Sequence, residues 1–171
     1  MVSNVIGEDE MNIRHLAEAD YDRVISVIDE WWGGRMMSDM LQRLFFIHFQ
    51  ETSFVIEEKH KIIGFLVGFP SQTDPNIGYI HFVGIHPKAR KEGHARILYE
   101  AFFEKIKELG CDNVLCVTSP VNKGSIAFHK RMGFTIKPGT KVVNGISIYE
   151  NYDGPGKDRI IFTKSLDEKR T

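Results

Sequence analysis

Four basic residues surround one glycine in the stretch HPKARKEGHARI, residues 86–97. The four are Lys88, Arg90, Lys91 and Arg96. A strand before such a turn and a helix after it form an anion site, because the first amides of a helix have no intrahelical partners. The helix dipole adds about half a positive charge at that end, and Gly93 lets the backbone approach a phosphate closely. The stretch therefore predicts a diphosphate-binding turn, although this stretch alone leaves open an ordinary solvated basic turn.

The common phosphate-binding motifs are absent from the chain. It contains no G-x-x-x-x-G-K-[ST], which argues against a P-loop nucleotidase. It contains no G-x-G-x-x-G after a strand either, which argues against the usual dinucleotide-binding fold. The predicted phosphate ligand must therefore be of another kind.

Strands and helices alternate around the basic turn. A strand over residues 78–86 stops at a proline, and an amphipathic helix follows the turn and is closed by Gly110. A buried strand over 113–119 comes next, and Asn122 then caps a short helix that ends near Met132. This order predicts a sheet that is at least partly parallel and covered by helices.

The remaining segments predict helices and further strands. Asp20 is expected to cap the first helix, which the glycine pair after Trp32 ends. The other expected elements are a strand over 12–16, a helical stripe over 37–45, strands over 53–58 and 61–69, a strand over 134–137, a loop that contains Asn144 and Gly145, a polar turn over 153–157 and a last strand over 160–164.

Composition predicts one globular domain over residues 1–171, with 1–11 as a flexible tail. The chain is 42% hydrophobic and 26% charged, with a formal net charge of -1, so no basic excess favours nucleic acid or a membrane as partner. No leader sequence and no long apolar run are evident. Cys111 and Cys116 form neither a disulfide framework nor a metal-ligand spacing, so we expect a cytoplasmic protein without a metal ion.

Two segments resemble the signatures of the GCN5-related N-acetyltransferases, the GNAT family. FVGIHPKARKEGHARILYEAF resembles that family's motif A, and Arg90 to Ala95 match its [Q/R]-x-x-G-x-[G/A] pattern in register. VNKGSIAFHKRMGF resembles the second signature, an asparagine followed by a helix that ends in Gly-Phe. The resemblance covers residues 50–137 well and the two N-terminal helices more loosely. The segments WWGGR and YDGPG are similar to those of bacillus-type members.

The resemblance implies an acetyl-CoA-binding α/β fold. This fold is a mixed, partly parallel central sheet with splayed strands, flanked by helices, and the coenzyme lies where the strands over 78–86 and 113–119 diverge. The residues implied in cofactor binding are Val83, Gly84, Ile85, Arg90, Lys91, Glu92, Gly93, His94, Ala95 and Asn122. The backbone of the first three would pair with the pantetheine, and the turn would hold the diphosphate.

The implied reaction is direct transfer of an acetyl group to a primary amine. The family's usual glutamate falls on Tyr79, which cannot act as a base near neutral pH. His81 matches the histidine that arylalkylamine-type members use, and we expect it to share a strand face with Tyr79, Val83 and Ile85, because side chains alternate along a strand. His129 stands where members usually carry the tyrosine that assists thiolate departure. Both histidines have a structural alternative, in which they only pack.

The acceptor remains open at the level of sequence. Trp32, Arg35 and Tyr79 are candidate acceptor residues, and Arg35 could hold an acceptor carboxylate. Tyr149, Tyr152 and Asp153 could line the same pocket. The partner would be a small-molecule or peptide amine, and a homodimer is left open. Two rivals also stay open, a CoA-binding sensor without catalysis and an enzyme that uses a longer acyl-CoA.

Overall fold

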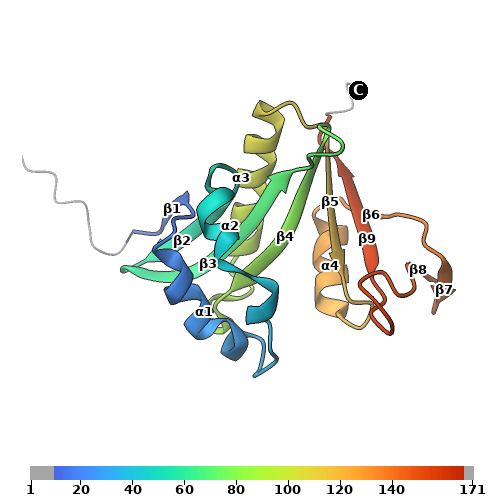
Figure 1. Cartoon of the computed structure of the whole chain (residues 1–171), viewed down its shortest axis with the longest axis horizontal. Coiled ribbons are helices and arrows are strands. Elements are labelled where there is room, and N and C mark those ends of the chain that lie inside the picture. Colours follow the sequence, from blue (N-terminus) through green and yellow to red (C-terminus); the bar gives the residue numbers. More distant parts are fainter. Residues whose placement is uncertain (1–9, 168–171) are drawn as a thin grey trace, which may run out of the picture. The chain divides into compact units, whose positions relative to one another are not determined.

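The chain folds into two compact units, which Figure 1 shows in a computed structural model that describes residues 10–167. Unit 1 comprises the chain up to Phe69 together with Phe82–Lys105, and unit 2 comprises Pro70–His81 and the chain from Ile106 onward. Most of the predicted tail, residues 1–9, lies outside the described residues. No helix in the described range is both long enough and apolar enough to cross a membrane.

One seven-stranded sheet has the strand order β1-β2-β3-β4-β5-β9-β6, and a separate hairpin consists of β7 and β8. The strands are β1 Asn12–His15, β2 Phe54–Glu58, β3 Lys61–Pro70, β4 Ile77–Ile85, β5 Asn113–Thr118, β6 Thr135–Ile136, β7 Lys141–Val143, β8 Ile146–Ile148 and β9 Ile160–Ser165. The helices are α1 Asp20–Trp31, α2 Arg43–His48, α3 His94–Glu108 and α4 Lys123–Arg131, with short 3₁₀ helices at Ser38–Met40, Gln50–Thr52 and Pro87–Ala89.

The sheet confirms the mixed α/β class. β4 and β5 pair in parallel, with Ile77 opposite Asn113 and Tyr79 opposite Leu115. The pairs β1–β2, β2–β3, β5–β9 and β6–β9 are antiparallel. The predicted parallel portion is therefore correct, and most of the sheet is antiparallel. The splay implied beyond these pairs stays a prediction.

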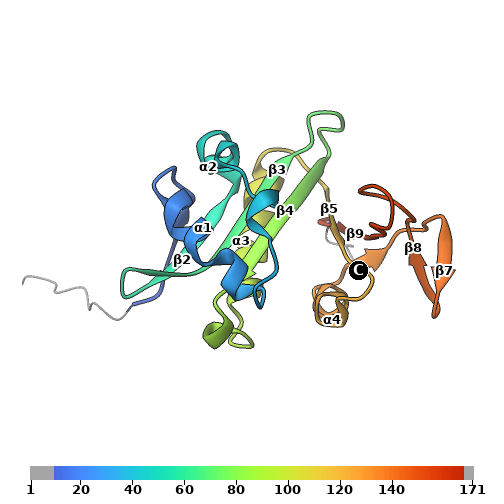
Figure 2. The same ribbon diagram turned by 60° about the horizontal axis from the view of Figure 1, so that its bottom comes forward.

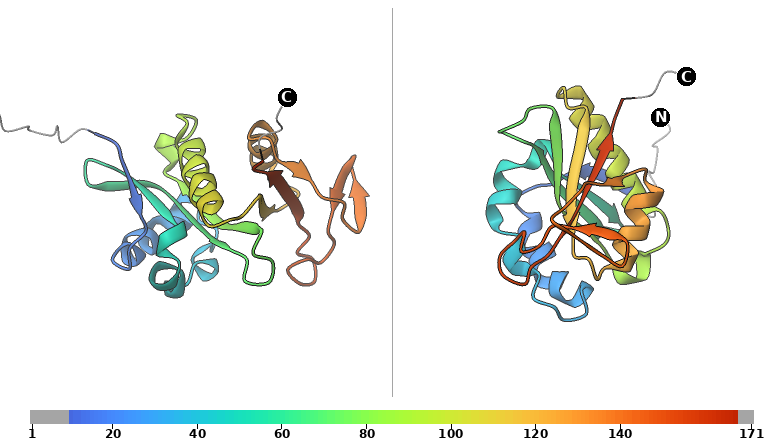
Figure 3. Two further views of the ribbon diagram at one scale, coloured as in Figure 1. Left: turned by 90° about the horizontal axis from the view of Figure 1, so that it is seen from above. Right: turned by 90° about the vertical axis from the view of Figure 1, so that its right-hand side faces the viewer.

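Unit 1 packs helices on both faces of its strands. A Cβ placed on Gly64 would lie 3.4 Å from Leu98 of α3, whereas the neighbouring Phe65 has its ring 6.1 Å from that of Trp31 in α1. The left view of Figure 3 shows α3 on one side of these strands and α1 with α2 on the other. The strand face toward α1 carries the core of unit 1, in which Val24, Phe46 and Phe65 are fully buried.

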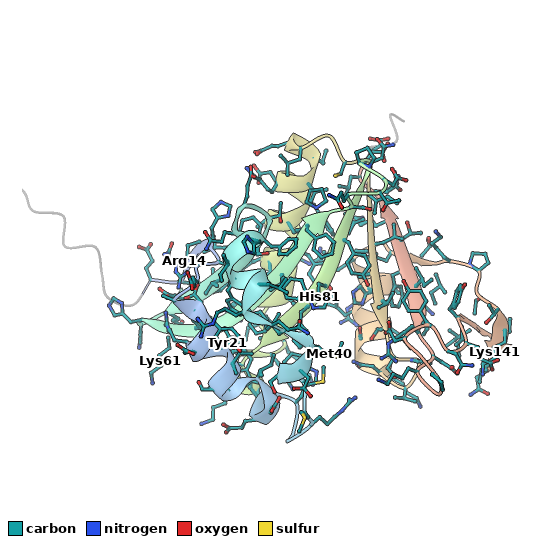
Figure 4. The ribbon with its side chains drawn as sticks, viewed as in Figure 1. Arg14, Tyr21, Met40, Lys61, His81 and Lys141 are labelled. Atoms are coloured by element: carbon teal, nitrogen blue, oxygen red, sulfur yellow. The ribbon has the colours of Figure 1, made fainter. Side chains whose placement is uncertain are left out.

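Asp20 begins α1 but does not cap it as predicted. Ala19 occupies the N-cap position, and no side chain caps the helix. The Asp20 carboxylate instead accepts hydrogen bonds of 2.8 Å from both Arg14 nitrogens and from the Ala17 amide (Arg14 is labelled in Figure 4). Burial by itself raises the pKa of Asp20, but these hydrogen bonds outweigh it, so the pKa lies below its usual value. Through its bonds to Arg14, Asp20 connects β1 to the start of α1.

The helix predicted over residues 37–45 is wrong, because the segment breaks into a 3₁₀ turn and the separate helix α2. Asp29 of α1 accepts hydrogen bonds from the amides of Met37 and Ser38 at 2.7 and 2.9 Å. The Asp29 carboxylate therefore holds the start of this segment against α1. A stripe of apolar residues in the sequence could not show that contact.

Unit 2 contains a hairpin where the sequence predicted a loop. β7 pairs antiparallel with β8 around Asn144 and Gly145, which have φ angles of +50° and +76°. Asn-Gly with two positive φ angles is typical of a two-residue hairpin turn, a signal that the sequence analysis missed. Figure 2 shows the hairpin standing apart from α4. Lys141 anchors its base through Glu150 at 2.6 Å and Asp158 at 3.1 Å.

Candidate functional site

The basic turn connects β4 to α3 in unit 1. β4 ends at Ile85, the 3₁₀ helix Pro87–Ala89 follows, and α3 begins at His94. Two residues between them have left-handed backbone conformations, Lys91 with φ +66° and Gly93 with φ +86°. A lysine in this region is uncommon and costs about 1 kcal/mol or more, so the surrounding turn must impose it.

The first amides of α3 have no hydrogen-bond partner within the helix. The first helical hydrogen bond runs from the Ile97 amide to the Gly93 carbonyl, at 3.2 Å. The amides that precede Ile97 in the first turn have no carbonyl one turn earlier in the helix. A Cβ on Gly93 would meet no atom within 4 Å, so open space lies beside this glycine. The turn thus combines helix-terminal amides with room for a ligand.

The four cations of the turn differ in their contacts. Arg90 donates hydrogen bonds to two backbone carbonyls, to that of Trp31 at 2.6 Å and to that of Ile85 at 3.2 Å. Arg96 lies 3.7 Å from Glu100 on the exposed face of α3. Lys88 and Lys91 are exposed. Sequence could not reveal that Arg90 is held by α1.

Two histidine side chains form hydrogen bonds with backbone groups of the turn. The Nδ1 atom of His86 accepts a hydrogen bond from the Lys88 amide at 3.1 Å. Nδ1 of His94 lies 2.9 Å from the Ala89 carbonyl, which can only accept, so Nδ1 carries the proton. The His94 side chain therefore connects the start of α3 to the 3₁₀ helix before it, within the turn predicted to bind the cofactor.

Gly84 is a glycine because aromatic rings fill the space of its side chain. A Cβ there would lie 2.5 Å from Cε1 of Phe65 and 3.1 Å from Cη2 of Trp32. The Trp32 ring also packs against Phe82, at a centroid distance of 5.2 Å. The β4 backbone at Val83 to Ile85, predicted to pair with pantetheine, is thus supported from the α1 side by rigid rings.

Two glycines of β4 contact different helices in the two units. In unit 2 a Cβ on Gly78 would lie 2.7 Å from Ile106 of α3, so Gly78 faces that helix. In unit 1 the Gly84 position faces Trp32 and the following Ile85 packs on the Gly64 position beside Leu98 of α3. Positions 78 and 84 would share a face in a regular strand. The expectation that Tyr79 and Ile85 share a face stays a prediction, because the two residues belong to different units.

The candidate acceptor residues Trp32 and Arg35 lie at the end of α1. Gly33 and Gly34 have φ angles of +67° and +88°, which lets the chain turn sharply after the helix. Arg35 is exposed and Trp32 is half-buried. The Asp29 carboxylate accepts hydrogen bonds from the amides of Ser38 and Met37, at the end of this segment. These hydrogen bonds hold the pKa of Asp29 below its ordinary value. The sequence analysis missed Asp29, whose only signal was a carboxylate one turn before a glycine pair.

Tyr79 and His81 lie on the portion of β4 that belongs to unit 2 (His81 is labelled in Figure 4). Burial raises the pKa of the Tyr79 phenol, and the neighbouring Tyr152 and Asp153 raise it further. Tyr79 therefore stays protonated at neutral pH, as the sequence analysis expected. Tyr152 and Asp153 lie close enough to Tyr79 to influence its charge, which places the predicted rim residues beside this strand.

His129 is buried among aromatic rings in unit 2. Its ring stacks on Phe162 at 4.6 Å and meets Phe134 edge-on at 5.2 Å. Nδ1 lies 2.7 Å from the Ser125 carbonyl, so this nitrogen carries the proton. Burial lowers the pKa of His129, and the Ser125 hydrogen bond only partly offsets that effect. A neutral ring protonated at Nδ1 has no proton to donate from Nε2, which favours the packing alternative.

Asn122 caps α4 as predicted. Its side-chain oxygen accepts a hydrogen bond from the Ser125 amide at 3.1 Å. Its predicted contact with pantetheine stays a prediction. Among residues 10–167, no group of three or more histidine, cysteine, aspartate or glutamate side chains is placed to hold a metal ion.

Comparison with known sequences identifies a related family. The sequence model of the acetyltransferase (GNAT) family matches residues 12–134. No curated protein sequence matches the chain.

Solved structures share the fold along nearly the whole chain. A Salmonella typhimurium protein solved with its cofactor acetyl-CoA is 19% identical, with a TM-score of 0.66 over 94% of this chain and 96% of that one. Diaminobutyrate acetyltransferase from Paenibacillus lautus, solved with L-2,4-diaminobutyric acid and coenzyme A, is 18% identical, with a TM-score of 0.70 over 95% and 99%. The ribosomal-protein-S18-alanine N-acetyltransferase of Escherichia coli is 15% identical, with a TM-score of 0.65 over 95% and 99%. At these identities the likeness shows the fold alone, and the closer likeness to bacillus-type members stays a prediction.

Proposed function

Because the chain belongs to the acetyltransferase (GNAT) family, we propose that it transfers the acetyl group of acetyl-CoA to a primary amine. The observation that carries this proposal is the turn before α3. Two left-handed residues, Lys91 and Gly93, precede a 15-residue helix, and open space lies beside the glycine. A diphosphate is a ligand that such amides and the surrounding cations can hold.

In this proposal unit 1 supplies most of the coenzyme contacts. The amides from Lys91 to Ala95 would bind the diphosphate, and the backbone of Val83 to Ile85 would pair with the pantetheine. The aromatic packing behind Gly84 supports that assignment, because it keeps the strand backbone in place.

The chemical step needs a neutral amine. Its nitrogen lone pair attacks the thioester carbonyl carbon, the C–S bond breaks, and coenzyme A leaves as a thiolate. A lysine-like amine has a pKa of about 10.4, so a base must take a proton from the attacking nitrogen near neutral pH. We assign this role to His81, acting through water, since histidine changes charge between pH 5 and 8. Tyr79 cannot take it, because its phenol stays protonated.

His129 receives a packing role in this proposal. Its stacked ring and the proton on Nδ1 favour a neutral side chain, which cannot protonate the departing sulfur. The thiolate of coenzyme A, with an ordinary thiol pKa of about 8.5, can then leave and take its proton from solvent.

The acceptor belongs to a broad class. One similar structure is named for diaminobutyrate and another for a ribosomal-protein alanine, so small molecules and proteins are both acetylated by proteins of this fold. We therefore propose a primary amine of either kind for this chain. The exposed Arg35 would hold an acceptor carboxylate if the acceptor has one.

A second candidate function is a CoA-binding sensor without catalysis. It is favoured by the neutral Tyr79 where the family usually carries glutamate, and by the buried His129 where it usually carries tyrosine. Both functions require the coenzyme to bind, so they differ only in turnover.

Two measurements separate these outcomes. Calorimetry with coenzyme A should show saturable binding, and absence of binding would reject both functions. Release of free thiol from acetyl-, propionyl- and succinyl-CoA should then be followed with a panel of amines that includes diamines, amino acids and peptides. Turnover supports the enzyme and reports its acyl preference, whereas binding without turnover on the whole panel supports the sensor.

A further inference from the structure

The hairpin of unit 2 is a two-stranded sheet with a free edge. β7 and β8 form a sheet of their own, and among residues 10–167 β7 pairs with no other strand. The backbone groups on the far side of β7 therefore have no sheet partner in this part of the chain. An isolated pair of strands is only marginally stable in water, and further strands stabilise it. The edge of β7 is thus a position where another strand can add.

The outer face of this hairpin carries an apolar side chain at the centre of β7. Val142 lies opposite Ser147, and Lys141 lies opposite Ile148. Side chains alternate along a strand, so Val142 and Ile148 point to opposite faces. Ile148 is buried, so its face is the covered one, whereas Val142 on the outer face is 69% exposed. A partner strand at the β7 edge would cover this valine.

Hydrogen bonds fix the base of the hairpin. The Gly139 amide donates to the Ser147 hydroxyl at 2.6 Å, and the Thr140 amide donates to the Ile148 carbonyl at 2.9 Å. The Thr140 hydroxyl in turn accepts a hydrogen bond from the Glu150 amide at 2.8 Å. A strand that is already ordered loses little conformational entropy when it pairs. The free edge of β7 is therefore prepared for association.

The charges around β7 favour a second copy of the same strand as its partner. The Lys141 ammonium, labelled in Figure 4, lies 2.6 Å from Glu150 and 3.1 Å from Asp158, so its charge is balanced within its own chain. If two copies of β7 pair antiparallel about Val142, Lys141 of each copy lies opposite Val143 of the other. No like charges then face each other, and every residue of β7 has a partner. The strand is thus complementary to itself, as a two-fold interface requires.

We propose that two copies of this chain associate through β7, which pairs antiparallel with its copy about a two-fold axis at Val142. The two hairpins then form one four-stranded sheet, in which the two Val142 side chains cover each other on the outer face. A contact between strands of three residues is small beside the about 1,000 Å² of a stable interface, so the association is weak and reversible. This inference goes beyond acetyl transfer and does not require the coenzyme.

A concentration series tests the association. Sedimentation equilibrium of the wild-type protein should show a dimer whose share rises with protein concentration. Val142→Lys should raise the dissociation constant about 10-fold or more, because it removes both central valines and places two like charges at the axis. Val121→Lys is the matched control, since Val121 is 82% exposed at another place in unit 2. This control should associate as the wild-type protein does.

A cross-link tests the register of the two strands. In an antiparallel pair the Cα atoms of opposite residues lie about 4.5–5.5 Å apart, a distance that a disulfide can span. Val142→Cys should therefore form a covalent dimer on oxidation with diamide, and Val121→Cys should not at the same protein concentration. The natural Cys111 and Cys116 are buried, so the wild-type protein serves as the blank.

Hydrogen–deuterium exchange locates the interface without a substitution. The amides of residues 141–143 should exchange more slowly in the wild-type protein as the dimer forms. Residues 113–118 are the internal control, because β5 pairs with β4 on one side and β9 on the other. Their exchange should not depend on protein concentration. Should Val142→Lys fail to fold by circular dichroism, this measurement and the cross-link decide.

The outcomes support or refute the β7 interface without reference to the proposed function. A wild-type protein that stays monomeric over the whole series refutes it. A dimer also refutes it if Val142→Lys associates as the wild type does, if Val142→Cys forms no cross-link, or if exchange at residues 141–143 stays unchanged, because the chains then meet through another surface. None of these results bears on coenzyme binding, which calorimetry tests separately.

Discussion

In unit 1 the charged candidate residues lie on an exposed turn, whereas in unit 2 the candidates Tyr79, His81 and His129 are partly or wholly buried. Lys88, Lys91 and Gly93 are exposed, and polar bonds to backbone carbonyls hold the turn in shape. His129 of unit 2 stacks on Phe162, and burial shifts its pKa and that of Tyr79 toward their neutral forms. Exposed charges can meet an anionic ligand without a large desolvation cost, and buried groups cannot keep a charge cheaply. The two units therefore differ in the groups they carry: unit 1 has charged side chains on its turn, and unit 2 keeps Tyr79 and His129 neutral.

Replacing His81 by alanine tests the chemical side of this comparison and should have the largest effect. Loss of a general base lowers the rate by about 100-fold or more. We expect kcat/KM for thiol release at neutral pH to fall by that amount, while calorimetry shows unchanged affinity for coenzyme A. His48→Ala, at the exposed end of α2, is the control and should leave both unchanged. An unaltered pH–rate profile in His81→Ala would remove this histidine from the role of base.

Replacing Gly84 by alanine tests the aromatic support beneath the binding strand. The new Cβ would lie 2.5 Å from the rigid ring of Phe65, and overpacking of this kind costs about 1–3 kcal/mol of unfolding free energy. We expect a clear drop in the denaturant midpoint. The new Cβ in Gly64→Ala would come closest to the flexible Cδ1 end of Ile85, at 2.8 Å, with its other neighbours at 3.4 Å, so this variant should cost less. Equal losses in the two variants would argue against the ring contact as the cause.

Replacing Gly93 by alanine tests the binding side of the comparison. Each charge-assisted hydrogen bond to the diphosphate contributes about 1.5–3 kcal/mol, so disturbing one should weaken coenzyme A binding about 10-fold or more. Gly110→Ala is the matched control at the other end of α3, because Gly110 also has a positive φ, +91°, and a Cβ placed there would meet no atom within 4 Å. Both variants should lose similar stability. Similar losses of affinity in both would contradict a ligand site beside Gly93.

The pH dependence of stability tests the buried state of His129 and should show the smallest effect. Because burial lowers its folded pKa below the unfolded value of 6.5, the unfolded state binds the proton more readily. The stability is therefore fully present above that value and decreases as the pH falls toward the lower, folded pKa. Thermal unfolding between about pH 7.5 and 5.5 should show this decrease. His129→Phe, which keeps a ring stacked on Phe162, should reduce the dependence, and an unchanged dependence would assign it to other groups.

Local residue patterns were sufficient to predict the elements around the turn. Pro87, Gly93 and Gly110 mark the ends of β4 and α3, and the structure places the helix from His94 to Glu108 between them. Asn122 caps α4 as expected. These signals act within a few residues along the chain, through proline, glycine and capping side chains, so they can be recognised without knowing the fold.

Only the tertiary structure decided how those elements are tied together. Arg90 binds the carbonyl of Trp31, and the rings at Gly84 come from Phe65 and Trp32, all far away in the sequence. Asp29 binds amides that lie beyond a sharp turn of the chain. The sequence by itself thus determined the family and the boundaries of the turn before α3, because both depend on short segments. Packing between separate segments decided which charges remain exposed and which side chains are buried as neutral groups, since that outcome depends on partners far along the chain.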